Sequence, residues 1–282
     1  MIEIIANSIY TRVMKKLAKV EQILQNNNIE YKVHLTTEEK NATHLIRCCT
    51  SDKIIVIGGD GTLNQVLDNY NDEELIYFPS GSGNDLGRSL NLKKETKYFF
   101  EKLNSKAKRY DAGVVNDKKF CVGFDAGYSA NVVKKVNSSY MKKYLRKKTY
   151  TLWGIWCAIF AKTYKAKIVL ENKTIETNKL YLLTVMLHRY AGGGIDFFKN
   201  ANGHNGKFSV LIMRDMSRIK FIYNMICILL KKQQYLKDVE IFETKNDIQV
   251  TTNQKFYQVD GEVIENNKPL TIKCLRSFYK IK

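Results

Sequence analysis

Proline and paired cysteines are scarce in this sequence. The 282 residues include two prolines and six cysteines, and no two cysteines are spaced as Cys-x-x-Cys. The hydrophobic content of 44% and the low proline content together indicate folded, globular domains. The cysteine spacing argues against a disulfide framework, so we expect reduced thiols in a cytosolic protein.

The chain also has few acids and no long apolar run. Basic residues outnumber acidic ones by 46 to 28, a formal net charge of +18, but no apolar stretch reaches the roughly 20 residues that a membrane-spanning helix needs. The N-terminus carries no signal-peptide pattern. The positive charge suits an anionic membrane surface or nucleic acid, and equally an ordinary lysine-rich surface. Since no nucleic-acid-binding motif occurs, we expect no nucleic-acid partner.

A short aliphatic run at residues 54–57 predicts the strand around which the chain is organised. The run is β-branched and ends at glycine, which is typical of a strand buried on both faces in a parallel sheet. The glycines that follow permit a tight turn and let backbone N–H groups approach an anion. They are Gly58, Gly59 and Gly61.

Asp60 and Thr62 give this glycine loop its chemistry. Thr62 is placed to cap a predicted helix over residues 63–70, whose positive end faces the loop. The carboxylate of Asp60 lies inside the predicted anion cradle, where it would repel phosphate unless it binds a metal, a water or a substrate hydroxyl. The stretch therefore predicts a phosphate-handling turn with a carboxylate at its tip.

A second turn of the same kind follows. Residues 75–78 form another short apolar run, which leads into Pro-Ser-Gly-Ser-Gly-Asn-Asp-Leu-Gly-Arg at residues 79–88. Two strand-to-loop turns at the carboxyl edge of a parallel sheet are where α/β proteins bind ligands.

Apolar periodicity divides the chain into two domains. Up to about residue 108, short strands alternate with helices, which predicts an open parallel sheet. Further strands are expected there at residues 2–6 and 31–35, and helices at residues 14–26, 38–49 (capped by Thr37) and 93–103. From residue 109 to residue 268, strands at short intervals predict a mostly antiparallel domain. These strands are expected at residues 110–116, 119–123, 167–170, 181–187 and 208–213.

One helix is expected to interrupt the second domain. Residues 139–166 combine a basic first half with an apolar second half that contains Trp153 and Trp156. Tryptophan beside lysine is typical of a helix on a membrane surface, and an aromatic stripe at helical spacing is typical of a helix packed on the protein core. The same two interpretations apply to residues 219–232.

The last motif is Val-Asp-Gly-Glu-Val at residues 259–263. A strand over residues 254–259 leads into a turn with two carboxylates, Asp260 and Glu262. Strand alternation would place both on one face, unless Gly261 bends the chain. Taken alone, Asp-Gly is also a common hairpin turn.

Together, these motifs resemble the diacylglycerol kinase catalytic domain family of lipid kinases, which includes bacterial diacylglycerol kinases and sphingosine kinases. The glycine-aspartate motif alone is shared with NAD kinases and phosphofructokinases, whereas the Gly-Asn-Asp-Leu-Gly-Arg turn is much more specific to the lipid kinases. The resemblance implies an open parallel α/β domain like that of NAD kinase and phosphofructokinase, a mostly antiparallel C-terminal β-sandwich, and an active site in the cleft between them. It also implies that residues 269–282 return to complete the first domain, residues 1–108.

The resemblance assigns roles to residues at matching positions. Nucleotide-binding roles fall on Asn7, Thr37 (with Thr36 also fitting), Gly58, Gly59, Gly61, Thr62, Ser82 and Asn84. Asp60 and Asp85 would position Mg²⁺, directly or through water, and Asp260 or Glu262 would be the catalytic base. Asn205 stands where relatives carry an aspartate that holds a structural magnesium, and asparagine is the weaker ligand because it lacks the charge.

Other positions depart from the family pattern. The first loop, residues 7–12, contains neither glycine nor proline, Gln65 stands in place of a glutamate, and Lys199 stands where relatives often carry proline. These departures support a degenerate, non-catalytic homologue that holds nucleotide or lipid as one alternative. An NAD kinase-like enzyme is another.

The sequence therefore predicts a lipid kinase that uses ATP and Mg²⁺ and transfers the γ-phosphate to the hydroxyl of a lipid alcohol such as diacylglycerol. We expect it to be cytoplasmic and to visit the anionic inner face of the membrane transiently. No motif names the lipid, and a homodimer is left open.

Overall fold

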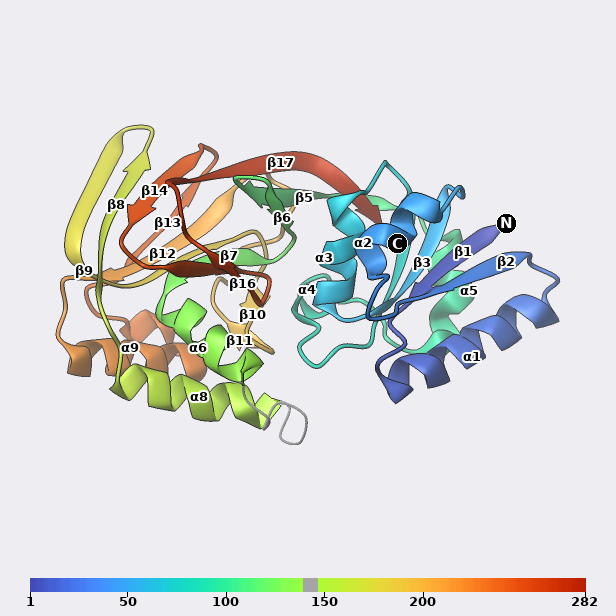
Figure 1. Cartoon of the computed structure of the whole chain (residues 1–282), viewed down its shortest axis with the longest axis horizontal. Helices are drawn as coiled ribbons and strands as arrows, with labels where there is room; N and C mark the ends of the chain where they lie inside the picture. The colour runs from blue at the N-terminus through green and yellow to red at the C-terminus, as the bar shows by residue number, and fades with distance from the viewer. Residues whose placement is uncertain (139–146) are drawn as a thin grey trace.

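The computed structural model of the protein describes residues 1–138 and 147–282. Figure 1 shows an α/β domain on the right and a β-rich domain on the left, with two long strands running between them at the top. This arrangement confirms the predicted fold class.

The first domain contains a parallel sheet with the strand order β2-β1-β3-β4. Its strands are β1 (Ile2–Ala6), β2 (Tyr31–Leu35), β3 (Lys53–Gly58) and β4 (Glu74–Pro79). Its helices are α1 (Thr11–Asn26), α2 (Ala42–Leu45), α3 (Asp60–Asp68), α4 (Asp85–Ser89) and α5 (Phe99–Asn104). The predicted strands at residues 54–57 and 75–78 are confirmed as β3 and β4.

Both faces of this sheet are buried, which explains why its strands are continuously apolar. Ile55 and Ile57 of β3 pack in one cluster with α1 and α5. Ile54 and Val56, which alternate with them, pack in another cluster with α2 and α3. A strand covered by helices on both sides has no polar face, as is usual in parallel sheets.

Three helix predictions in this domain are wrong in their boundaries. The helix expected over residues 38–49 is limited to α2 and a 3₁₀ turn at Ile46–Cys48. Its cap is Asn41, whose side chain accepts the N–H of His44, because Thr37 instead closes a turn by accepting the N–H of Lys40 at 2.9 Å.

The other two corrections concern α3 and α5. Helix α3 begins at Asp60 with Gly59 as its N-cap, so Thr62 lies within the first turn and does not cap it. The helix expected over residues 93–103 is a 3₁₀ turn at Thr96–Tyr98 followed by α5.

The second domain is mostly antiparallel, as predicted. Its strands are β5 (Lys108–Val115), β6 (Lys118–Phe120), β7 (Gly123–Gly127), β8 (Tyr164–Leu170), β9 (Lys173–Met186), β10 (Tyr190–Ala191), β11 (Ile195–Asp196), β12 (Phe208–Arg214), β13 (Glu240–Thr244), β14 (Ile248–Thr252), β15 (Phe256–Val259), β16 (Glu262–Glu265) and β17 (Leu270–Ile281). The side chains of Phe120, Phe124 and Phe208 lie in its apolar core.

Three helices among the described residues lie on one side of the second domain, at the bottom of Figure 1. They are α6 (Tyr128–Asn137), α8 (Lys147–Ile159) and α9 (Arg218–Leu229). The single helix expected over residues 139–166 is wrong at its C-terminal end, because β8 begins at Tyr164 and pairs with β9 and β14. Residues 139–146, which carry much of its basic half, lie outside the described residues.

Strand β17 joins the sheets of the two domains. Most of it pairs antiparallel with β5, and its end at Lys280 and Ile281 pairs parallel with β4. The register shifts between Leu275 and Tyr279, where Ser277 has a φ of 49°. Asp111 of β5 accepts the N–H of Ser277 at 2.8 Å and so holds this bulge in place.

Candidate active site

The loops after β3 and β4 lie against each other with almost no space between their backbones. The carbonyl of Gly58 accepts the N–H of Ser80 at 2.6 Å, and a Cβ atom added to Gly81 would lie 2.5 Å from the Cα of Gly59. No side chain fits at residue 81 unless the loops move apart. At Gly61, in contrast, an added Cβ would meet nothing within 4 Å.

We therefore expect Gly81→Ala and Gly61→Ala to have opposite effects on stability. Gly81→Ala should lower the free energy of unfolding by about 1–3 kcal/mol, the usual cost of an overpacked site. Gly61→Ala, the matched control, should raise it by about 0.5–1 kcal/mol because residue 61 lies in α3 and alanine is the better helix former. Urea unfolding of both variants tests this, and equal midpoints would contradict the close approach of the loops.

Asp60 connects the two loops. Its Oδ2 accepts the N–H of Asp85 at 2.8 Å and its Oδ1 accepts the N–H of Leu86 at 3.2 Å, so it satisfies the first donors of α4. Asp85 in turn accepts hydrogen bonds from Arg88 at 2.9 Å and from the N–H of Gly193 at 2.8 Å. Gly193 belongs to the second domain, so this chain of contacts ends at the domain junction.

The carboxylates gathered here disfavour one another's ionised forms. Burial and then the negative charge of Asp85 raise the pKa of Asp60 to about 7, although two backbone N–H groups oppose the shift. Burial also raises the pKa of Asp260, against three backbone N–H groups that favour its charged form. Buried like charges of this kind are a frequent feature of functional sites.

These groups suit a hard divalent cation such as Mg²⁺. Carboxylate oxygens are the ligands that this ion prefers, and a carboxylate that accepts one or two N–H bonds can still coordinate a cation through its remaining lone pairs. The hydroxyl of Tyr77 is fully buried and makes no hydrogen bond to any residue that the structure describes. Burial raises the pKa of Tyr77 well above its usual value, and the charges of Asp60 and Asp85 raise it further. A metal ion would offset the charge of the crowded acids, and a water bound to it would donate to this hydroxyl.

The Asp-Gly-Glu motif forms a hairpin turn that sends its two acids in different directions. Asp260 and Gly261 have φ values of 46° and 85°, the positive values that a type I′ turn requires. Of the two arrangements that the sequence left open, the chain adopts the one in which a bend at Gly261 separates Asp260 from Glu262. Asp260 faces inward and accepts the backbone N–H groups of Cys121, Val122 and Gly123 at 2.7–3.0 Å.

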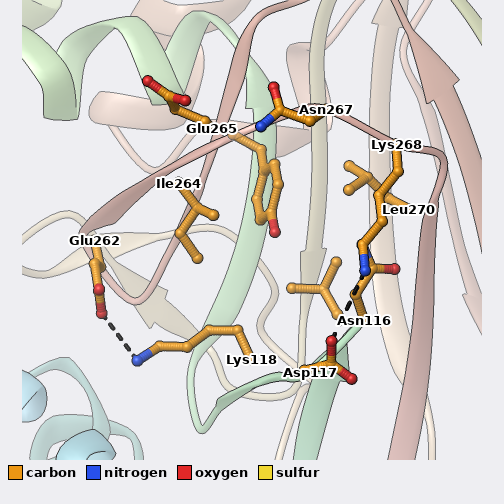
Figure 2. Close-up of a pocket in the computed structure, with 11 residues that line it drawn as sticks. Asn116, Asp117, Lys118, Glu262, Ile264, Glu265, Asn267, Lys268 and Leu270 are labelled. Carbon is orange, nitrogen blue, oxygen red and sulfur yellow. Dashed lines mark ion pairs between the residues drawn. The ribbon is translucent and has the colours of Figure 1, made fainter.

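Glu262 faces outward into a cavity of about 530 Å³ beside the hairpin. Figure 2 shows its carboxylate pointing at Lys118, with an N–O distance of 3.0 Å. Lys118 also approaches Asp68 of α3 at 3.4 Å. This lysine thus links Glu262 to the first domain, and the sequence offered no signal for its role because its partners lie far away along the chain.

Family models match both parts of the chain, and the division between them falls after β5. The diacylglycerol kinase catalytic domain model covers residues 4–115, and the YegS C-terminal NAD kinase beta sandwich-like domain model covers residues 123–281. The chain belongs to the diacylglycerol kinase-like family of lipid kinases.

Individual proteins and solved structures that are similar to this chain include diacylglycerol kinases. A diacylglycerol kinase of Bacillus subtilis (strain 168) is 27% identical over 259 residues, which cover 88% of this chain and 84% of the relative. A crystal structure of a diacylglycerol kinase from Bacillus anthracis str. Sterne has a TM-score of 0.77 at 20% identity, over 99% of this chain and 96% of that one. An NAD kinase from Archaeoglobus fulgidus in complex with ATP has a TM-score of 0.54 at 11% identity, over 97% and 90%. The two structures show a shared fold.

The first loop of this lipid kinase-like chain is held by side chains that follow three different strands. Asn7 donates to the hydroxyl of Thr62 at 3.1 Å, and the hydroxyl of Thr36 accepts the N–H of Ser8 at 3.2 Å. Of the two threonines that fitted the family position, Thr36 therefore contacts the first loop. Thr37 contacts Lys40 instead.

In the second loop, Asn84 and Ser82 have different surroundings. The amide of Asn84 is used within the loop, because it accepts the N–H of Gly81 at 2.6 Å and donates to its carbonyl at 2.9 Å. Ser82 is exposed and accepts a hydrogen bond from Arg12 of α1 at 3.3 Å. Arg12, a cation at the edge of the glycine loops, was not predicted as a site residue.

Asn205 lies in an exposed turn before β12. Its side chain accepts the N–H of Lys207 at 3.1 Å, and the neighbouring Gly206 donates its N–H to Asp111 at 2.7 Å. Asp111 is the buried carboxylate of this region, and it was not singled out from the sequence.

Within residues 1–138 and 147–282, no helix is long and apolar enough to cross a bilayer.

Asp125 of β7 is a buried acid that the sequence analysis also missed. Thr184 and Gln258 donate to its carboxylate, but burial still raises its pKa to about 6. A carboxyl whose pKa rises on folding binds its proton more tightly in the folded state, so it destabilises the fold as pH rises from about 4 to about 6.

We expect Asp125→Asn to weaken the pH dependence of stability. In the wild type, the free energy of unfolding should fall by up to about 3 kcal/mol between pH 4 and pH 7 through Asp125 alone, and the variant should lack this part. Urea unfolding at pH 5 and pH 7.5 measures the difference. The readout is the change of unfolding free energy with pH, because the new NH₂ group alters the contact with Gln258 equally at every pH. If this change were the same in the variant as in the wild type, the raised pKa of Asp125 would be contradicted.

Proposed function

We propose that the protein is an ATP-dependent lipid kinase that transfers the γ-phosphate to the hydroxyl of a lipid alcohol such as diacylglycerol. The observation that carries the proposal is the position of Asp60, which ties two glycine loops together and shares the domain junction with Asp85 and Asp260. Phosphoryl transfer requires held phosphates, offset charge and a base beside the acceptor hydroxyl, and residues for each task meet here.

The first domain supplies the nucleotide-binding residues in this proposal. Gly59, Gly61 and Thr62 would bind phosphate oxygens at the start of α3, where an exposed glycine leaves room for the backbone to approach. Arg12 would contact a phosphate from the side, since its guanidinium lies beside the second glycine loop and donates to the exposed Ser82. Ser82 would hold the nucleotide from the second loop.

Asp60 and Asp85 would hold Mg²⁺, directly or through water. When bound, the ion would offset the negative charge of the phosphates during transfer. Asp60 and Asp85 also orient the two loops and keep the γ-phosphate side of the site polar. Asn7 fixes the position of the Thr62 hydroxyl by donating a hydrogen bond to it.

Glu262 is the better candidate for the base. Asp260 already accepts three backbone N–H groups and the thiol of Cys121, so it acts best as the anchor of the hairpin. The Glu262 side chain is 59% exposed and pairs with Lys118 alone among the described residues. It is therefore free to turn toward a lipid hydroxyl and accept its proton.

The test is transfer of labelled γ-phosphate from ATP with Mg²⁺ to a panel of lipid alcohols in mixed micelles, with NAD in parallel and Glu262→Gln as the control. Label in one lipid that is lost in the variant would support the kinase and identify its substrate. Label in NAD would favour an NAD kinase, for which the fold shared with the Archaeoglobus fulgidus enzyme is the supporting observation. ATP binding without transfer to any acceptor would favour the degenerate homologue.

A further inference from the structure

Three side chains of different chemistry meet at the outer edge of the first sheet. Glu3 belongs to β1, His34 belongs to the edge strand β2, and Cys49 follows the 3₁₀ turn at Ile46–Cys48. A carboxylate oxygen, an imidazole nitrogen and the thiol sulfur of these residues lie within 4.8 Å of one another. Figure 1 shows β1 and β2 at the right of the molecule, on the far side of the first domain from the domain junction. None of the three takes part in the proposed phosphate transfer.

Strand pairing brings Glu3 and His34 to the same face of the sheet. Ile5, two residues after Glu3, is the parallel register partner of His34, and alternate residues of a strand share a face. Ile5 packs in the apolar cluster beneath α2 and α3, and Cys49 packs against the same cluster. Glu3 is only 1% exposed, so this polar group is enclosed on an otherwise apolar face.

Backbone contacts hold the Glu3 carboxylate in one orientation. Its Oε2 accepts the N–H groups of Thr50 and Ser51 at 2.7 and 2.9 Å, and its Oε1 lies 3.2 Å from Nε2 of His34. Hydrogen bonds to one oxygen of a carboxylate are a common way of orienting the other oxygen toward a metal ion. Glu3 pairs with no lysine or arginine of the described residues. A buried carboxylate of this kind has room for a cation beside it.

The spacing and chemistry of the three ligand atoms suit a zinc ion. Bonds of about 2.0–2.3 Å in a tetrahedral arrangement place the ligand atoms of Zn²⁺ roughly 3.3–3.6 Å apart, and Oε1 of Glu3 and Nε2 of His34 are 3.2 Å apart. A thiolate, an imidazole and a carboxylate together favour Zn²⁺ over Mg²⁺, which takes oxygen ligands. Without metal the thiol of Cys49 keeps its proton, because burial and the charge of Glu3 raise its pKa to about 12. Zinc would displace that proton to solvent.

We propose that Glu3, His34 and Cys49 bind one Zn²⁺ ion, with water in the fourth position. Nε2 of His34 would exchange its contact with Glu3 for the metal, and Sγ of Cys49 would exchange its contact with the carbonyl of Leu45. One thiolate and one carboxylate neutralise the charge of the ion. The ion would join β1, β2 and the turn before β3, and so stabilise the first domain. It would not act on phosphate transfer directly, because this turn precedes β3 and the glycine loop follows it.

The test is titration of the reduced full chain, freed of metal by a chelator, with Co²⁺ and then with Zn²⁺ in competition with a chromophoric chelator. Excess Mg²⁺ competes for the acids of the candidate active site. We expect one Co²⁺ per chain, a thiolate-to-cobalt absorption band, and loss of that band when Zn²⁺ replaces Co²⁺. Cys49→Ser should abolish the band, and Cys49→Ser and His34→Gln should each weaken Zn²⁺ binding by about a hundredfold or more.

Cys48→Ser and His44→Gln are the matched controls, because they alter exposed side chains of the same two types close to the site. Both should bind Zn²⁺ as the wild type does. Glu3 is left in place because it also holds the turn at Thr50 and Ser51. Zinc should raise the melting temperature of the wild type and of both controls, but not that of Cys49→Ser.

A Glu3–His34 pair beside a thiol that binds no metal is the alternative that this experiment decides. Zinc binding by the wild type no tighter than by Cys49→Ser would overturn the proposal. An absorption band that persisted in Cys49→Ser, or vanished in Cys48→Ser, would also overturn it, because the thiolate ligand would then be another cysteine.

Discussion

Asp60→Ala is expected to lower the rate of phosphate transfer to lipid by about a thousandfold, the scale of losing a preorganised electrostatic group. The substitution removes the acceptor for the N–H groups of Asp85 and Leu86 and one of the acids that would hold Mg²⁺. The fold should survive, because the lost hydrogen bonds are offset by removal of a carboxyl whose pKa is raised to about 7 by burial and then by the charge of Asp85. Initial rates at saturating ATP and circular dichroism measure the two effects.

Asp117→Ala is the matched control for this variant, since the Asp117 side chain is almost fully exposed on the other domain. Asp60→Asn gives a second comparison, because it keeps one acceptor oxygen but removes the charge, and we expect it to be as inactive as the alanine variant. Full transfer by a folded Asp60→Ala protein would mean that the first glycine loop is not the phosphate site.

Substitution of the two acids of the hairpin should have different effects, on stability for Asp260 and on catalysis for Glu262. Asp260→Ala is expected to lower the free energy of unfolding by about 3 kcal/mol, because three backbone N–H groups lose a charged acceptor. Glu262→Gln should leave the melting temperature within about a degree or two, as expected for an exposed position. It should lower kcat by about a hundredfold, the scale of a lost general base.

Thermal melts and steady-state rates of both variants distinguish the residue that anchors the hairpin from the residue that acts as the base. The Glu262→Gln variant keeps the shape of the side chain while losing its basicity, so a normal KM for ATP is expected. If Glu262→Gln transferred phosphate at the wild-type rate while a stable Asp260→Asn did not, the two roles would be the reverse of those proposed.

The parts of the molecule that the sequence predicted well are those decided by neighbouring residues. Residues 54–57 and 75–78 form strands because each run is apolar on both faces and a glycine or proline ends it. The glycine loops follow directly from those strand ends. The position of Asp60 between two loops could therefore be expected from local pattern and family resemblance together.

The parts that it missed depend on contacts between distant residues. The direction of Asp260 is fixed by N–H groups more than 130 residues away, and strand alternation says nothing about them. Lys118 reaches both Glu262 and Asp68 only because the folded domains bring them together. Likewise, Trp153 packs against the core and Trp156 is exposed, and this choice depends on which side of α8 the core occupies.

The bulge in β17 bears on how the two domains move. Strands β5 and β17 form a two-stranded ribbon between them, and such a ribbon is stiff wherever its hydrogen-bond ladder is intact. The ladder is interrupted near Ser277, where Asp111 clamps the backbone. Hinge motion between the domains is therefore expected at this bulge, and an opening of the junction where the reaction is proposed to occur would break the hydrogen bond from Gly193 to Asp85.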